Sequence, residues 1–194
     1  MLFLIIKGTL SENVRRLYVK DHDEKDAQST KPAEYAFDLV CTSCREAHGS
    51  PVLINLVEKH EMPGSKGEAS FIMKCKFCSK DISVNLLKFE KYLYNPDSGV
   101  EEDELEEKSI KLTRKKHGLK SLKENNNAAI LQLDCRGCEL TKFYPSSVMF
   151  QAELTSGNVM DCQFENGEDE WYDYDEDAGE EVSVSSFQSE IIKG

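Results

Sequence analysis

The chain opens with a continuous apolar run. Residues 2–6 are Leu-Phe-Leu-Ile-Ile, and Thr9 and Leu10 continue the strand pattern beyond Gly8. A short run of this kind predicts a β-strand, with Gly8 as a bulge inside it. The run stops at Lys7, so it is too short to cross a membrane, and it lacks the basic region and cleavage site of a signal peptide. We therefore expect a protein without membrane contact.

Four later segments also have the pattern of short strands. Residues 34–41 alternate apolar and polar positions for most of their length, as half-buried strands do, and residues 52–57 are a second candidate. Turn residues at 63–67 precede a third candidate at 69–74, and a fourth follows at 82–87. This succession predicts a small antiparallel sheet.

Two Cys-x-x-Cys pairs lie at the ends of these strands. Cys41 and Cys44 follow the first candidate strand, and Cys75 and Cys78 follow the third. Two such tight turns can supply the tetrahedral Cys₄ set that Zn²⁺ prefers, with no position left open for water or substrate. The residues therefore predict one structural zinc ion per chain. Four metal-free buried thiols, or an iron or iron–sulfur centre on the same ligands, are the alternatives.

The cysteine count bears on the cellular compartment. The chain of 194 residues is 39% hydrophobic and holds seven cysteines, six of them in three Cys-x-x-Cys pairs. An odd number, wide spacing and the missing signal peptide favour reduced thiols on a metal over a disulfide framework. We expect a cytoplasmic protein, with the nucleus as an alternative, and a monomer with a sizeable core.

Charge is distributed unevenly along the chain. The formal net charge is −12, and thirteen Asp and Glu but no Lys, Arg or His lie between Phe143 and Ile192. The rest of the chain is nearly neutral. Because a phosphate backbone is bound through Lys and Arg, this balance argues against nucleic-acid binding.

Residues 95–127 interrupt the strand pattern. An acidic block at 101–107 is followed by a basic block at 111–123 and then by three asparagines. This composition predicts a solvated linker, whose deletion between 101 and 126 should leave the fold intact. An interaction tail with a basic patch at 114–117 is the alternative.

The pattern then partly repeats. Residues 128–138 align without gaps on residues 34–44, and residues 181–184 resemble 81–84. We interpret the chain as mainly β, with two related antiparallel halves packed with pseudo-two-fold symmetry. These are a zinc-binding half at 1–94 and, after the charged insertion at 95–127, a degenerate acidic half at 128–194 without a complete metal site.

A set of short motifs in a fixed order carries a family resemblance over nearly the whole chain; they are residues 64–70, 74–78, 135–137, 156–157 and 170–176. The chain resembles the eukaryotic CXXC-motif-containing zinc-binding proteins, a family of unknown function. The resemblance implies a β-rich fold of two similar halves, one zinc on Cys41, Cys44, Cys75 and Cys78, and no catalytic activity. Two features depart from the family pattern: Cys138, where relatives have an apolar residue, and the length of the insertion.

Several other residues are candidates for chemistry. Cys135 and Cys138 could form a redox pair, or a partial second metal site with Cys162, but a relic turn with reduced thiols fits better because a fourth ligand is missing. His48 could replace a ligand, although a solvated loop histidine is the simpler interpretation.

Trp171 lies among acids where the second cysteine turn should recur in the repeat. A catalytic carboxylate cluster there would need a nucleophile or an orienting third group, which this stretch does not supply. We expect Trp171 to pack in the core while the acids face water, with a protein-docking surface anchored by Trp171, Tyr172 and Tyr174 as the second interpretation. The sequence thus predicts a non-enzymatic zinc protein that binds another protein; a thiol oxidoreductase or metal-handling protein is the alternative.

Overall fold

The computed structural model of the protein describes residues 1–21, 31–119, 122, 126–165 and 167–194. The fold is mainly β, and its strands pair antiparallel, as predicted. None of the helices in this described part is long and apolar enough to span a membrane. In chain order the elements are β1 (Leu2–Leu10), β2 (Val14–Val19), β3 (Tyr35–Cys41), β4 (Val52–Ile54), β5 (His60–Glu61), β6 (Glu68–Ala69), β7 (Phe71–Lys74), β8 (Asp81–Lys88), β9 (Leu93–Tyr94), the 3-10 helix η1 (Pro96–Ser98), α1 (Glu101–Lys116), β10 (Asn127–Arg136), β11 (Cys138–Tyr144), the 3-10 helix η2 (Pro145–Ser147), β12 (Phe150–Leu154), β13 (Val159–Cys162), β14 (Trp171–Asp175) and β15 (Glu180–Lys193).

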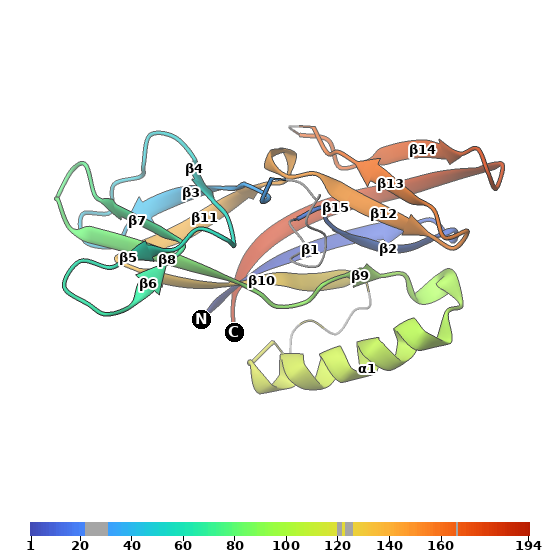
Figure 1. Ribbon diagram of the computed structural model, residues 1–194, viewed down its shortest axis with the longest axis horizontal. Helices are drawn as coiled ribbons and strands as arrows, with labels where there is room; N and C mark the ends of the chain where they lie inside the picture. Colours follow the sequence, from blue (N-terminus) through green and yellow to red (C-terminus); the bar gives the residue numbers. More distant parts are fainter. Residues whose placement is uncertain (22–30, 120–121, 123–125, 166) are drawn as a thin grey trace.

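Three long strands connect the two ends of the molecule. β15, β1 and β10 lie side by side in a six-stranded sheet with the order β14-β15-β1-β10-β8-β7. A three-stranded sheet, β11-β3-β4, lies at the end that carries β7 and β8, and a four-stranded sheet, β13-β12-β2-β9, lies at the other end (Figure 1). A two-stranded sheet joins β5 to β6. The two chain termini meet, since the N–H of Gly194 donates to the carbonyl of Met1.

The sheets combine strands from both predicted halves of the sequence. β1 lies between β10 and β15, β11 pairs with β3, and β12 pairs with β2. The ends of the molecule therefore do not coincide with residues 1–94 and 128–194. Antiparallel pairing takes whichever strand offers a matching edge and face, however distant in sequence. The pseudo-two-fold relation between the halves stays a prediction.

Strand β1 is central because both of its faces are buried. Leu4 and Ile6 belong to the main hydrophobic core, whereas Phe3 and Ile5 face a second, smaller cluster with Leu119. Side chains alternate between the faces of a strand, so burial of both faces requires the continuous apolar run seen in the sequence. The register between β1 and β15 does shift between Lys7 and Thr9, but β15 advances there by three residues, from Gln188 to Ser185, while β1 advances by two. The extra residue of this bulge therefore lies in β15, opposite Gly8, and the prediction of a bulge at Gly8 itself is wrong.

Strand β2 is not predicted by the hydrophobic pattern. Its sequence, Val-Arg-Arg-Leu-Tyr-Val, places two arginines in the middle of a short element. Both arginines bind Asp103 of α1: Nε of Arg15 lies 2.7 Å from one carboxylate oxygen, and a terminal nitrogen of Arg16 lies 2.6 Å from the other. The charges are thus neutralised by a partner far away in sequence.

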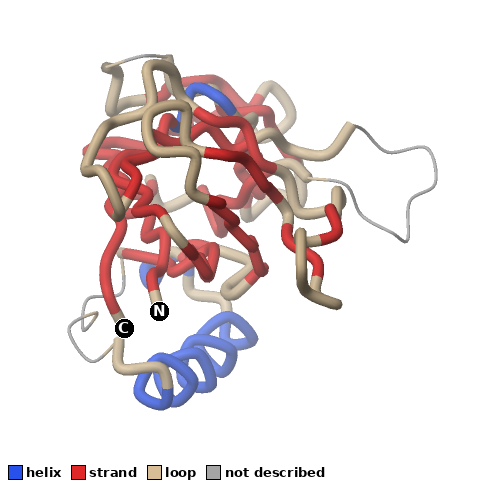
Figure 2. Tube along the Cα trace, turned by 90° about the vertical axis from the view of Figure 1, so that its left-hand side faces the viewer, coloured by secondary structure: helices blue, strands red, loops and turns tan. Residues whose placement is uncertain are grey.

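The expectation that residues 95–127 form a solvated linker is wrong for much of the segment. Residues 101–116 form helix α1, which lies along the outside of the strands (Figure 2). Asp103, Arg114 and Leu119 are buried. Arg114 makes a bidentate pair with Glu90, both contacts at 2.7 Å, and also donates to the side chain of Asn127 at 2.8 Å. The segment is therefore attached by buried charge pairs, and its removal would uncover both the pairs and the smaller core.

The Glu90–Arg114 pair predicts a large effect of a single substitution. Arg114→Met should destabilise the protein by about 3–5 kcal/mol, because it leaves the carboxylate of Glu90 buried without its charged partner. Lys115→Met is the matched control, since Lys115 is exposed on the same helix, and it should change stability by less than about 0.5 kcal/mol. Urea unfolding measures both values, and equal stability of the two variants would show that α1 is not anchored through this pair.

Candidate metal centre

The two Cys-x-x-Cys pairs adopt the same backbone turn. In the first cysteine turn (residues 41–46), the N–H of Arg45 donates to the carbonyl of Cys41, and the N–H of Cys41 donates to the carbonyl of Glu46. In the second cysteine turn (residues 75–80), the N–H of Ser79 donates to the carbonyl of Cys75, and the N–H of Cys75 donates to the carbonyl of Lys80. Arg45 and Ser79 have positive φ values of 65° and 59°. The left-handed residue turns the chain back, so that both sulfurs of each pair point to one side.

The two turns meet and bring four sulfurs together. The Sγ atoms of Cys41, Cys44, Cys75 and Cys78 all lie within 4.8 Å of one another. Two of the distances, Cys41 to Cys78 and Cys44 to Cys75, are 3.7 Å. Tetrahedral zinc with bonds of about 2.3 Å places its sulfur ligands roughly 3.8 Å apart. The four predicted ligands therefore fit a single zinc ion without rearrangement of the backbone.

The turns also favour thiolates, which are the form that binds metal. Backbone N–H groups of Cys44 and Ser43 bond to the sulfur of Cys41 and lower its pKa to about 6. The pKa of Cys75 is lowered in the same way by the N–H groups of Cys78 and Phe77. The sulfur of Cys44 also receives a backbone N–H, from Glu46, but desolvation and the neighbouring sulfurs outweigh that bond and raise its pKa to about 12. Four thiolates at this spacing repel one another, and a divalent cation removes that repulsion.

The third Cys-x-x-Cys pair joins the two turns without contributing a ligand. Residues 135–138, the cysteine corner, lie where the chain passes from β10 to β11. β10 pairs with β8, which leaves the second turn, and β11 pairs with β3, which enters the first. At the corner, the carbonyl of Gly137 accepts the N–H of Thr42 at 3.1 Å. The corner therefore fixes the position of one turn relative to the other.

Gly137 is the site residue that the sequence analysis missed. Its φ is +73°, and a Cβ atom at this position would lie 2.4 Å from the carbonyl oxygen of Asp81, directly after the second turn. Only glycine allows both the left-handed backbone and this close approach. The available signal was the glycine between Cys135 and Cys138, which a purely cysteine-based interpretation overlooks.

The remaining candidate ligands do not gather at the metal centre or at a second site. Cys138 pairs with Cys41 in the sheet register, and Cys162 is buried in β13 at the other end of the molecule. Among the described residues, the only group of sulfur, imidazole or carboxylate ligands close enough to hold a metal is the set of four. The Nδ1 atom of His48 lies 2.9 Å from the carbonyl of Ser50, so the ring serves its own loop.

The cysteine corner also lacks the surroundings of a thiol oxidoreductase. A hydrogen bond from Cys138 to Cys135 lowers the pKa of Cys135. However, the pair connects two strands, whereas the Cys-x-x-Cys of a thioredoxin-like enzyme is set in a β-α-β unit. This arrangement gives the redox alternative little support.

The acidic stretch after Trp171 is partly structural. Trp171 is half-buried and packs against the main core, whereas Tyr172 and Tyr174 are 65% and 50% exposed. Asp175 is buried, contrary to the expectation that all acids here face water. It accepts hydrogen bonds from Ser156 at 2.7 Å and from the side chain of Asn158, and these bonds hold its pKa below the ordinary value.

Comparison with known proteins covers almost the entire chain. The family model of the eukaryotic CXXC motif containing zinc binding proteins matches residues 3–192. The UPF0587 protein YCR090C of Saccharomyces cerevisiae is 53% identical over 196 residues, with 100% of this chain and 98% of the relative covered. The UPF0587 protein C2D10.03c of Schizosaccharomyces pombe is 33% identical, with 96% and 98% covered. The crystal structure of C1orf123 shares the fold, with a TM-score of 0.69 and 24% identity over 100% of this chain and 99% of that one.

The geometry predicts which cysteines hold the metal. Cys41→Ser should lose zinc and lower the melting temperature, because apparent zinc-binding free energies of about 10 kcal/mol or more are comparable to the stability of a whole domain. Cys135→Ser is the control, since its sulfur lies outside the cluster, and it should retain one zinc per chain. Metal analysis of the purified proteins and thermal melts provide the two measurements. A Cys41→Ser protein that kept its zinc would contradict the assignment.

The corner predicts an effect of a residue that carries no ligand atom. Gly137→Ala should destabilise the protein and speed the loss of zinc to a chelator, because the added methyl group meets the carbonyl of Asp81. Gly157→Ala isolates the backbone cost: its φ is +92° but nothing lies within 4 Å of a Cβ there, so only about 1–2 kcal/mol is expected. If Gly137→Ala cost no more than this control, the close approach would not matter for the site.

Proposed function

Because the chain belongs to the family of eukaryotic CXXC motif containing zinc binding proteins, we propose that its zinc is structural and that the protein acts by binding another protein rather than by catalysis. The four-sulfur cluster carries the first part of this proposal. A Cys₄ shell leaves no coordination position for water or substrate, so the bound metal supplies cross-linking and no Lewis-acid chemistry.

The cross-link acts on segments that are distant in sequence. The cluster ties the end of β3 to the connection between β7 and β8, while β4, β5 and β6 lie in the loop between the two turns. These three strands have only two or three residues each. Strands this short bury little surface, so closing the loop around them is an effective way to keep them ordered.

The proposed interaction function is supported by a polar, aromatic face on β14. Tyr172 and Tyr174 are two residues apart on this edge strand, so both rings lie on the same face. Asp173, which lies between them but points to the other side of the strand, and Glu176, which follows the strand, are also exposed. We call these four residues the tyrosine face. Exposed tyrosines are frequent interface anchors, and surrounding acids speed association with a basic partner. We propose that this protein is a monomer and that it meets its partner in the cytoplasm.

The tyrosine face can be tested without disturbing the metal centre. In a cell extract, chemical cross-linking to the wild type should capture partner proteins. A variant with Tyr172→Ser, Tyr174→Ser, Asp173→Asn and Glu176→Gln should no longer capture them, and the difference should be clearest at low salt. Zinc content and melting temperature should hardly change, since all four side chains are exposed and Asp175 is left in place.

A matched variant on helix α1 provides the control. Leu105 and Leu112 are 67% and 66% exposed, and Glu101 and Glu104 are exposed on the same helix. Changing these two leucines to Ser and the two glutamates to Gln removes a similar amount of apolar surface and charge. Proteins retained by this variant and lost by the first would be specific partners. Identical capture by all three proteins would refute the interaction face.

A further inference from the structure

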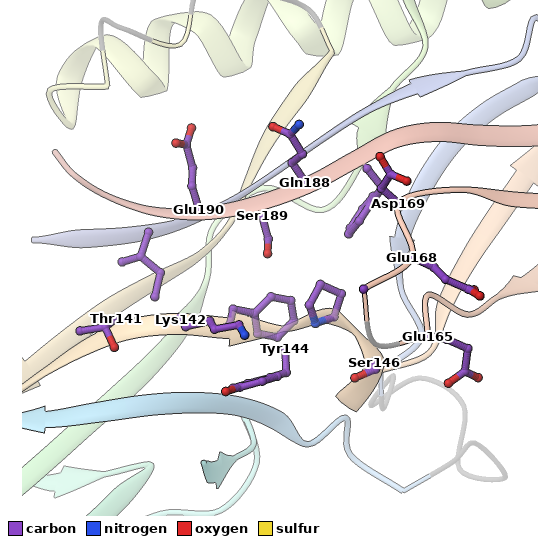
Figure 3. Close-up of a pocket in the computed structure, with 15 residues that line it drawn as sticks. Thr141, Lys142, Tyr144, Ser146, Glu165, Glu168, Asp169, Gln188, Ser189 and Glu190 are labelled. Atoms are coloured by element: carbon purple, nitrogen blue, oxygen red, sulfur yellow. The ribbon is translucent and has the colours of Figure 1, made fainter. Parts of the chain in front are cut away.

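A groove lies between β11 and β15, away from the metal centre. Its volume is about 540 Å³, within the range typical of ligand sites. Figure 3 shows β15 on one side of the groove and β11, continuing into η2, on the other. The buried rings of Phe143 and Phe187 contribute an apolar floor. Neither the zinc cluster nor the tyrosine face uses these residues.

The edge of β15 along this groove carries backbone groups without strand partners. β14 pairs with β15 only as far as Val184, whereas β1 pairs with it up to Lys193 on the opposite side. The N–H of Phe187 points away from β1, since it donates to the carbonyl of Asp169 at 2.8 Å. Backbone groups alternate along a strand, so those of Ser189 and Ile191 point to the same side. In the described part of the chain, no strand pairs with this edge.

β11 is also an edge strand, because its sheet has the order β11-β3-β4. The two edges therefore border the same groove. Figure 3 shows Ser189 directed into the space between the strands, whereas Gln188 and Glu190 point away from it. Exposed edges of this kind accept an additional strand readily.

The charges around the groove favour a basic occupant. Glu165, Glu168 and Asp169 lie at one end, all exposed, and none forms a salt bridge with a described residue. Glu190, by contrast, is paired with Lys7. Lys142 supplies a positive charge on the groove wall, and its Nζ atom lies 4.4 Å from the centre of the Tyr144 ring. The end of the groove is thus left with three uncompensated negative charges.

We propose that this groove binds an extended, basic segment of a partner protein, which adds as a strand to the edge of β15 between Phe187 and Ile191. Backbone hydrogen bonds to Ser189 and Ile191 provide affinity, and an apolar side chain of the segment packs over the floor of the groove. A lysine or arginine of the segment lies beside Glu165, Glu168 and Asp169. This inference rests on the proposed protein-binding function and specifies the chemistry of the partner.

A second copy of this chain fits the groove less well. A second copy has a formal net charge of −12, and its edge strand β14 carries the acids of the tyrosine face, so the acidic end of the groove would repel it. The proposal therefore commits to a basic segment from a different protein.

Selection from a display library of random octapeptides tests the proposal, with the zinc-loaded full chain as bait. Selected peptides should combine Lys or Arg with alternating apolar positions. The best of them, labelled with fluorescein, should bind in an anisotropy assay and lose at least about tenfold in affinity when its basic residues become Glu. Hydrogen exchange of residues 187–191 should slow when the peptide is bound.

Two protein variants locate the binding site. Glu165→Gln, Glu168→Gln and Asp169→Asn together should weaken the peptide about tenfold at low salt. The matched control, Glu101→Gln, Glu104→Gln and Glu181→Gln, removes three exposed acids outside both the groove and the tyrosine face and should leave the affinity for the peptide unchanged. Weakening by the control variant and not by the groove variant would overturn the proposal.

The backbone contact is tested separately. Two N-methylated peptides test it without altering the protein: one carries N-methyl groups on the odd-numbered residues (the first phase) and the other on the even-numbered residues (the second phase). The peptide whose N-methyl groups face β15 should lose binding, and the other should keep it. Equal binding of both phases, or a library that selects no basic peptide, would overturn strand addition at β15. Loss of natural partners by the tyrosine-face variant would still support the broader interaction function in that case.

Discussion

The metal centre depends on the placement of two cysteine turns against one corner of the chain. Each turn orients its two sulfurs by local hydrogen bonds, but the four sulfurs converge only because β10 and β11 hold β8 and β3 on either side of residues 135–138. The corner requires glycine at 137, where any side chain would meet the carbonyl of Asp81. The third Cys-x-x-Cys pair is thus explained by the geometry of the corner rather than by metal binding.

The rest of the fold transmits this arrangement through strands that are buried on both faces. β1 separates the main core from the smaller cluster, which includes Leu119 just after the end of α1, and its neighbours β10 and β15 come from the C-terminal part of the chain. Helix α1 is attached by charges rather than by a broad apolar face: Asp103 binds Arg15 and Arg16, and Arg114 binds Glu90. Buried pairs of this kind are costly to break singly, which makes them effective in specifying one position for the helix.

The two ends of the molecule differ in chemistry. At one end four thiols gather in the geometry of a closed Cys₄ zinc shell. Towards the other end, several exposed acids that form no salt bridge among the described residues lie near the exposed tyrosines on β14 and the unpaired edge of β15. The proposed structural zinc and the proposed binding surfaces therefore lie in different parts of the molecule.

The sequence by itself determined the features that depend on local pattern: the β class, the strands that deliver Cys41 and Cys75, and the four cysteines that gather at the metal centre. Spacing within a turn and alternation along a strand are local properties, so they can be inferred from neighbouring residues. Strand β2 and helix α1 escaped prediction because they direct charged residues into the protein. Arg15 and Arg16 of β2 are half-buried against Asp103, and Arg114 of α1 is buried against Glu90, and in both cases the partner is distant in sequence. The role of Gly137, the structural position of Asp175 and the groove along β15 were likewise decided by tertiary structure, since each depends on which segments pack together.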